Sequence, residues 1–162
     1  MRICRGMWAA GAEPFTYEGS HYRVKEVLNL PPPARTIPVG IGGGGDRMLD
    51  LVAREADEWN CPGAIFNLFE ERNGFLEKRL AKHGRSVRKS VQSVFRPGDG
   101  EFPGRLQFFN PALGIHGSPD RMAERACELR DMGLDGFYAI IAGDKGLDAA
   151  AQALPGIRAA LR

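Results

Sequence analysis

A run of four consecutive glycines behind a short apolar segment restricts the fold of this chain more than any other feature. The apolar segment is residues 37–41, and the glycines lead directly into an amphipathic segment that starts at Asp46. Apolar residues on both faces predict a buried parallel strand, and the glycines predict a tight turn from strand to helix. Backbone N–H groups in such a turn, beside the positive end of a helix, bind anions. We therefore predict a phosphate site whose backbone donors come from Gly42, Gly43, Gly44 and Gly45.

The same glycines also fit a purely structural interpretation, in which they only relieve strain in the turn. A run of four favours the binding interpretation, because one or two glycines suffice for a tight turn. Arg47, one residue into the expected helix, is a candidate for an additional cation at the phosphate.

Strands and helices alternate along the rest of the chain. Such alternation predicts an α/β fold with a parallel sheet and right-handed crossovers. The expected strands are residues 37–41, 56–60, 91–95 and 137–141, and the expected helices are residues 46–56, 64–83, 119–132 and 147–161. We expect Tyr138 to lie in the core and Asp46 to cap its helix. The first helix is expected to bury Met48, Leu51, Val52 and Ala56.

Residues 1–36 are expected to lead into this α/β region. Residues 1–10 have helical character, residues 15–24 predict a hairpin that turns at 18–20, and three prolines at 31–33 exclude helix and sheet. We expect residues 1–162 to form a single domain, with 1–36 as lead-in and 37–162 as βα units.

Composition excludes several classes of function. The net charge of +2 among 162 residues, with acids and bases interspersed, does not suggest nucleic-acid binding. The three cysteines are far apart and the three histidines lack metal-ligand spacing, so we expect no metal site and no disulfide framework. Neither a signal peptide nor a membrane-spanning run is evident, which makes the cytoplasm the expected location.

Two side chains at the end of the second expected strand are further site candidates. Asn60 is suited to donate a hydrogen bond to the phosphate, and Trp59 either walls the site or packs in the core. Cys61, with no histidine near it in sequence, is expected to be a small buried residue and not a nucleophile. No catalytic residue is assigned.

Two other phosphate-binding motifs fit the glycine run less well. Residues 40–45 satisfy the spacing G-x-G-x-x-G of dinucleotide-binding folds, but these folds need an acid at the end of the next strand, whereas Asp57 and Glu58 open it. A P-loop needs Gly-Lys-Ser/Thr at its end, and Gly45-Asp46-Arg47 does not supply it.

Five motifs occur in an order that is similar to that of a known family. They are Phe15-Thr16-Tyr17-Glu18-Gly19-Ser20-His21-Tyr22, Leu30-Pro31-Pro32-Pro33, residues 37–45, Ala56-Asp57-Glu58-Trp59-Asn60, and Ile115-His116-Gly117-Ser118-Pro119-Asp120 with Gly133-Leu134-Asp135-Gly136-Phe137. With these motifs in this order, the chain resembles the luciferase-like monooxygenase superfamily, and more narrowly its F420-dependent oxidoreductases.

The resemblance implies a partial TIM (β/α)8 barrel, because whole barrels have about 250 residues or more. We expect this chain to correspond to the C-terminal half, which holds the cofactor phosphate, while the other half holds the cofactor ring. The implied cofactor is coenzyme F420, with FMN as the alternative, and the implied reaction is hydride transfer with a small organic substrate. The alternative is a non-catalytic half-barrel that needs a partner, either a second copy of the chain or a complementing N-terminal half.

Overall fold

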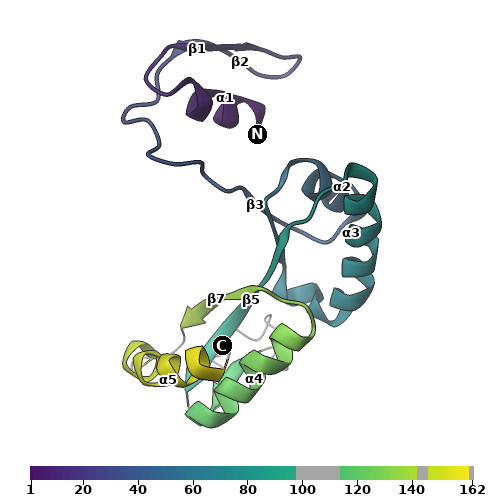
Figure 1. Cartoon of the computed structure of the whole chain (residues 1–162), viewed down its shortest axis with the longest axis vertical. Helices are drawn as coiled ribbons and strands as arrows, with labels where there is room; N and C mark the ends of the chain where they lie inside the picture. The colour runs from purple at the N-terminus through teal and green to yellow at the C-terminus, as the bar shows by residue number, and fades with distance from the viewer. Residues whose placement is uncertain (98–113, 142–145, 161–162) are drawn as a thin grey trace. The chain divides into compact units, whose positions relative to one another are not determined.

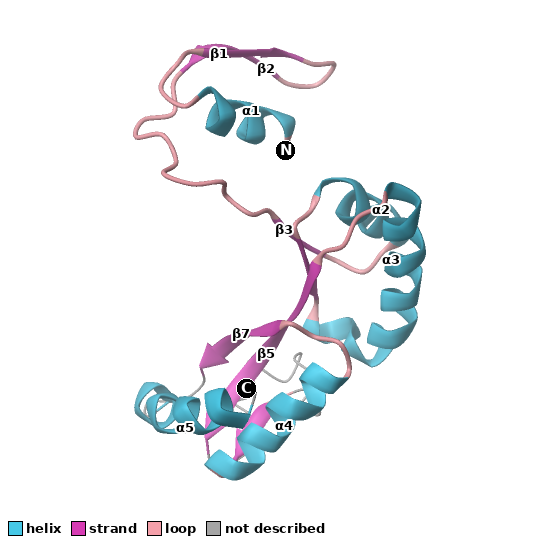
Figure 2. Cartoon of the chain, viewed as in Figure 1, coloured by secondary structure: helices cyan, strands magenta, loops and turns pink. Residues whose placement is uncertain are grey.

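The computed structural model describes residues 1–97, 114–141 and 146–160. The chain divides into two compact units, Met1–Val39 and Gly40–Arg162. Figure 1 labels most of the helices and strands along the chain, and Figure 2 distinguishes helix, strand and loop.

The first unit is a helix and a hairpin. Helix α1 (Arg2–Ala10) is followed by the antiparallel strands β1 (Phe15–Glu18) and β2 (Arg23–Val27). The Gly19 N–H donates to the Tyr22 carbonyl at 3.0 Å and closes the turn. The predicted helical start and hairpin are therefore confirmed. Gly6 lets the hairpin approach the helix, because a Cβ there would lie 2.1 Å from the Phe15 ring.

The second unit is built on a parallel sheet of five strands. These are β3 (Gly40–Gly42), β4 (Glu58–Cys61), β5 (Arg88–Pro97), β6 (Ile115–Gly117) and β7 (Gly136–Ile141). The order is β3-β4-β5-β6, and β7 also pairs with β5; every pairing is parallel. With its intervening helices, this arrangement is α/β and matches part of a TIM barrel, as predicted. The short strand β6 was not predicted.

Within the described residues, five helical segments accompany the sheet. They are α2 (Asp46–Glu55), the 3-10 helix η1 (Gly63–Leu68), α3 (Phe69–His83), α4 (Pro119–Asp131) and α5 (Gly146–Ala160). The predicted helix signals at Ser118 and Gly84 are confirmed. The Ser118 hydroxyl accepts from the Arg121 N–H at 3.3 Å, and Gly84 ends α3 in the left-handed conformation. Most of the loop expected at residues 96–104 lies outside the described residues, although Arg96 and Pro97 belong to β5.

The single helix expected over residues 64–83 is instead two. The break comes before Phe69, not at the Asn73-Gly74 pair, and Ile65 has non-helical backbone angles. The packing of aromatic rings explains the position of this break. Phe66, in the 3-10 turn, stacks on Phe69 with ring centroids 5.3 Å apart.

The buried face of α2 also differs from the expected one. Leu49, Val52, Ala53 and the following Ala56 are fully buried, whereas Met48 is 37% exposed. These four positions follow the spacing i, i+3, i+4, i+7 of one helix face. Asp46 is the first residue of the helix rather than its cap, which is Gly45.

The outer strands are less buried than predicted. Strand β3 is confined to residues 40–42, and Ile37 before it is 39% exposed. In β7, Tyr138 is 57% exposed, so its expected place in the core is wrong. In the described part of the chain β7 pairs with β5 alone, which leaves it less covered than a strand in the middle of a sheet.

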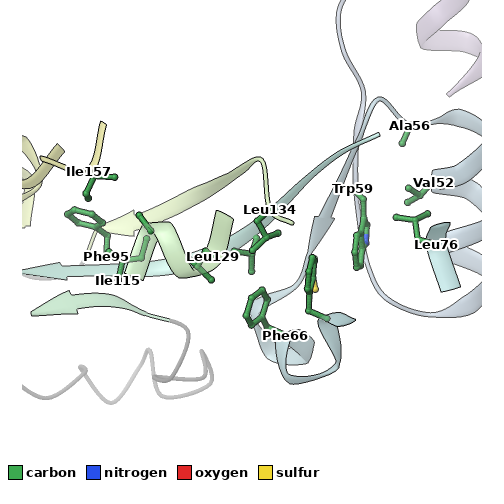
Figure 3. Close-up of a cluster of buried hydrophobic side chains, with 14 of the residues drawn as sticks. Val52, Ala56, Trp59, Phe66, Leu76, Phe95, Ile115, Leu129, Leu134 and Ile157 are labelled. Atoms are coloured by element: carbon green, nitrogen blue, oxygen red, sulfur yellow. The ribbon is translucent and has the colours of Figure 1, made fainter. Parts of the chain in front are cut away.

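The core lies on one face of the central strands (Figure 3). Trp59 and Cys61 of β4 share this face with Val91 and Phe95 of β5, and all four are buried. The register pairs Glu58 with Arg88 and Asn60 with Ser90, so the opposite face of the same strands carries polar side chains.

Candidate anion-binding site

The glycine turn joins the end of β3 to the start of α2. Gly43 adopts a φ of 130°, a conformation that glycine tolerates and other residues rarely adopt. Its N–H donates to the Asn60 carbonyl across a distance of 3.4 Å. The turn is thereby attached to the carboxyl end of β4, the end at which parallel α/β folds bind ligands.

Packing within the protein explains two of the four glycines. A Cβ at Gly43 would lie 2.7 Å from Met48 Cγ, and one at Gly44 would lie 2.0 Å from Ile65 Cδ1. Glycine at these two positions therefore lets the turn pack closely against Met48 and Ile65.

The other two glycines face open space. A Cβ added at Gly42 would have the Asn60 carbonyl oxygen as its nearest neighbour, at 3.7 Å, and one added at Gly45 would meet nothing within 4 Å. Gly45 also has ordinary extended backbone angles, φ −73° and ψ 152°. Because neither packing nor backbone strain requires glycine here, the space beside Gly42 and Gly45 is available to a ligand.

Backbone donors are present at the same place. The first N–H groups of a helix have no carbonyl partner within the helix, and Gly45 has no side chain with which to cap them. Within residues 1–97, 114–141 and 146–160, the backbone hydrogen bonds include none from the N–H groups of Gly45, Asp46 or Arg47. The start of α2 can therefore donate to an anion.

The charges at the start of α2 are mixed. Arg47 is exposed in the first turn, whereas Asp46 places a carboxylate beside the expected anion. Arg72 on α3 offsets that charge, since its Nη1 lies 3.2 Å from Asp46 Oδ1. Sequence analysis missed Arg72, because only the packing of α3 against α2 brings it here.

Trp59 holds the turn from the core side. The side chain is fully buried, and its Nε1–H donates to the Gly43 carbonyl at 2.7 Å. Its ring stacks on Phe69 with a centroid distance of 5.6 Å and an interplanar angle of 8°. Trp59 therefore packs in the core. Its other predicted role, as a wall of the ligand site, stays a prediction.

Asn60 is half-buried and belongs to a chain of polar side chains. Its Nδ2 donates to Ser90 Oγ at 2.9 Å, and Ser90 Oγ donates to Glu58 Oε1 at 2.6 Å. Sequence analysis missed Ser90 and Glu58 as members of this site. The alternation of side chains along each strand could have placed them on the same face as Asn60. That step also needs the register, which says which residues of β4 and β5 lie side by side.

Cys61 is buried, as predicted, and burial raises the pKa of its thiol to about 12. The thiolate is the reactive form of cysteine, so at pH 8 almost all Cys61 side chains are the unreactive thiol. At that pH we expect iodoacetamide to label the exposed Cys4 well before Cys61. Peptide mass spectrometry over a time course checks this order, and early labelling of Cys61 in the native protein would contradict it.

The same described ranges also bear on metal binding and membrane insertion. There, no group of three or more His, Cys, Asp or Glu side chains is placed to hold a metal ion. No helix in the described part of the chain is both long enough and apolar enough to cross a membrane. Glu58 opens β4, at the end of the strand away from the glycine turn, so it does not stand where a dinucleotide-binding acid would.

Several solved structures share this fold. An F420-dependent secondary alcohol dehydrogenase, in complex with an F420-acetone adduct, matches with a TM-score of 0.72 and 12% identity over 97% of this chain and 59% of its own. The coenzyme F420-dependent tetrahydromethanopterin reductase from Methanopyrus kandleri matches with a TM-score of 0.62 and 15% identity, over 96% of this chain and 60% of its own. A riboflavin lyase with modified FMN and riboflavin matches with a TM-score of 0.66 and 13% identity, over 90% of this chain and 48% of its own.

These identities are low, so the likeness establishes the fold. The chain spans about half to three fifths of the length of these proteins. No curated protein sequence matches it. The family model for luciferase-like monooxygenases matches residues 1–101, which include the hairpin, the glycine turn and strand β4. The chain therefore belongs to the luciferase-like monooxygenase family.

Proposed function

We propose that the chain is part of an oxidoreductase that uses coenzyme F420 or FMN, and that its glycine turn holds the cofactor phosphate. Family membership and neighbours that include F420- and FMN-containing proteins support this general class. The observation that carries the proposal is the open space beside Gly42 and Gly45, next to the N–H groups at the start of α2.

The residues present fit a phosphate group. The N–H groups of Gly45, Asp46 and Arg47 supply donors, and the helix start supplies partial positive charge. Arg47 adds a cation, and Arg72 neutralises the Asp46 carboxylate that would otherwise repel the ligand. When bound, the cofactor ring supplies hydride transfer with a small organic substrate, and the protein supplies position and electrostatics.

A second candidate is a non-catalytic half-barrel that acts only with a partner. The observation in its favour is that, among the described residues, β3 pairs with β4 alone and β7 with β5 alone, so both strands offer an unpaired edge to a partner. The partner is then a second copy of this chain or a separate chain that contributes further strands. The molar mass of the purified chain in solution, measured by light scattering, distinguishes association with a second copy from a monomer.

We expect Gly42→Val to weaken binding of F420 or FMN at least tenfold, because the valine fills the space that the phosphate needs. Gly40→Val is the matched control. Gly40 lies two residues earlier on the same face of β3, and a Cβ there meets no atom within 4 Å, whereas one at Gly42 meets only the Asn60 carbonyl oxygen, at 3.7 Å. Valine suits a strand at both positions, so the two variants differ in their distance from the turn.

Fluorescence titration of the purified chain with each cofactor measures the effect. Binding that is lost in Gly42→Val and retained in Gly40→Val supports the phosphate site and identifies the cofactor. Binding of neither cofactor to the unmodified chain contradicts a self-sufficient cofactor site and favours the half-barrel that needs a partner. Equal loss in both variants contradicts the position of the site.

A further inference from the structure

The polar face of the sheet carries a connected set of side chains from three strands. Glu58 and Asn60 lie on β4, Ser90 lies on β5, and Tyr138 lies on β7. Ser90 is 2% exposed and is the buried polar residue of the described chain. A buried hydroxyl needs partners, and Ser90 has one on each side: Asn60 and Glu58.

The chemistry of these groups fixes the direction of every hydrogen bond between them. A carboxylate only accepts, so the single hydroxyl proton of Ser90 is donated to Glu58 Oε1. The Ser90 oxygen must then accept from Asn60, and only the amide nitrogen of Asn60 can donate. Glu58 therefore determines, through Ser90, which way the Asn60 amide is turned.

Glu58 is itself held in place. Tyr138 of β7 interacts with it, since the Glu58 carboxylate is the main cause of a raised pKa of the Tyr138 hydroxyl. Arg88 Nη1 lies 3.8 Å from Glu58 Oε2. Glu58 is thus the terminal acceptor of a hydrogen-bonded relay that runs from Asn60 through Ser90.

The consequence concerns what Asn60 offers to a ligand. Because Nδ2 is turned to Ser90, the amide carbonyl Oδ1 is the end that is turned away from the relay. Asn60 lies in register with Gly42, and its backbone carbonyl accepts from the Gly43 N–H. A carbonyl oxygen repels a phosphate oxygen but accepts a hydrogen bond from a hydroxyl group.

We propose that Glu58 and Ser90 are positioning residues that turn the Asn60 amide so that Oδ1 accepts from a hydroxyl of a polyol phosphate. The site then prefers a phosphate that carries an adjacent hydroxylated chain over inorganic phosphate. This inference rests on the proposed phosphate site at the glycine turn. It replaces direct donation from Asn60 to the phosphate with recognition of the neighbouring hydroxyl.

Calorimetric titration of the full chain with ribitol 5-phosphate and with inorganic phosphate tests the inference. We expect Asn60→Ala to weaken binding of ribitol 5-phosphate about tenfold, the size of one hydrogen bond, and to leave inorganic phosphate unchanged. Ser90→Ala should have the same selective effect, and Ser90→Thr, which keeps the hydroxyl, should restore it. In an Asn60→Ala background, Ser90→Ala should have no further effect on binding, because Ser90 acts through Asn60.

A measurement without ligand tests the relay itself. In a ¹⁵N-labelled chain, the Asn60 side-chain NH2 resonances, identified by their loss in Asn60→Ala, should show slowed hydrogen exchange. Ser90→Ala should abolish this protection. Absence of protection in the unmodified chain overturns the relay.

The failures of the two proposals are distinguishable. Binding of neither probe overturns the phosphate site and this inference together. Binding of inorganic phosphate with equal or no effect of Asn60→Ala on the two probes leaves the phosphate site standing and overturns the role of Asn60. Additive effects of Ser90→Ala and Asn60→Ala overturn the positioning role of Ser90.

Discussion

Replacing Trp59 with alanine is expected to lower the free energy of unfolding by about 3–5 kcal/mol. The indole is fully buried between β4 and the helices, so its removal leaves a cavity in a packed interior. The stack on Phe69 and the hydrogen bond from Nε1 to the Gly43 carbonyl are lost at the same time. Urea denaturation followed by circular dichroism measures the change.

Trp59→Phe separates the two contributions. Phenylalanine keeps an aromatic ring beside Phe69 but leaves the Gly43 carbonyl without its indole donor. The lost hydrogen bond costs about 1 kcal/mol, with a smaller cavity term than in the alanine variant. Equal destabilisation by phenylalanine and alanine would show that the ring stack contributes little.

Phe95→Ala is expected to cost a similar amount, about 3–5 kcal/mol, at the other end of the sheet. Phe95 is 2% exposed and lies where β5 changes neighbours, opposite Ile115 of β6 and Ile141 of β7. It belongs to the core cluster with Ile115 and Ile157 of α5 (Figure 3). Removal of the Phe95 ring therefore weakens the packing of β6, β7 and α5 against β5.

Phe75→Ala is the matched control for this variant. Phe75 is 37% exposed on α3, where the guanidinium groups of Arg72 and Arg79 lie 5.6 and 5.8 Å from its ring centroid. Its truncation is expected to cost less than that of Phe95, because a ring that is more than one third exposed leaves no enclosed cavity and exposed cation–π pairs are weak. Thermal and urea denaturation of the two variants, compared directly, check the difference. A Phe75 variant as unstable as the Phe95 variant would contradict the place assigned to the core.

Local signals predicted much of the secondary structure. Gly84 ends α3 and Ser118 caps α4, because a left-handed residue and a hydroxyl acceptor are requirements that a few residue types meet. The alternation of strand and helix likewise predicted the parallel sheet. By contrast, the break before Phe69 depends on the ring stack with Phe66 and Trp59, which no local pattern encodes.

Burial was predicted less well at the margins of the sheet. Tyr138 lies in an apolar run that is typical of a buried parallel strand, yet it is 57% exposed. The run determines that a strand forms, whereas the exposure of its side chains depends on what packs over each face. The same reason applies to Ile37, which precedes the short strand β3.

The amino-acid sequence by itself determined the glycine turn, its place between a strand and a helix, and the resemblance to the family. These are properties of consecutive residues, since a missing Cβ and a helix start act on their immediate neighbours. Only the tertiary structure decided which glycines face open space, that Arg72 pairs with Asp46, and that Glu58 orients Asn60 through Ser90. Each of these depends on strand register or helix packing, and in the last two features the paired residues are 26 to 32 positions apart in the sequence.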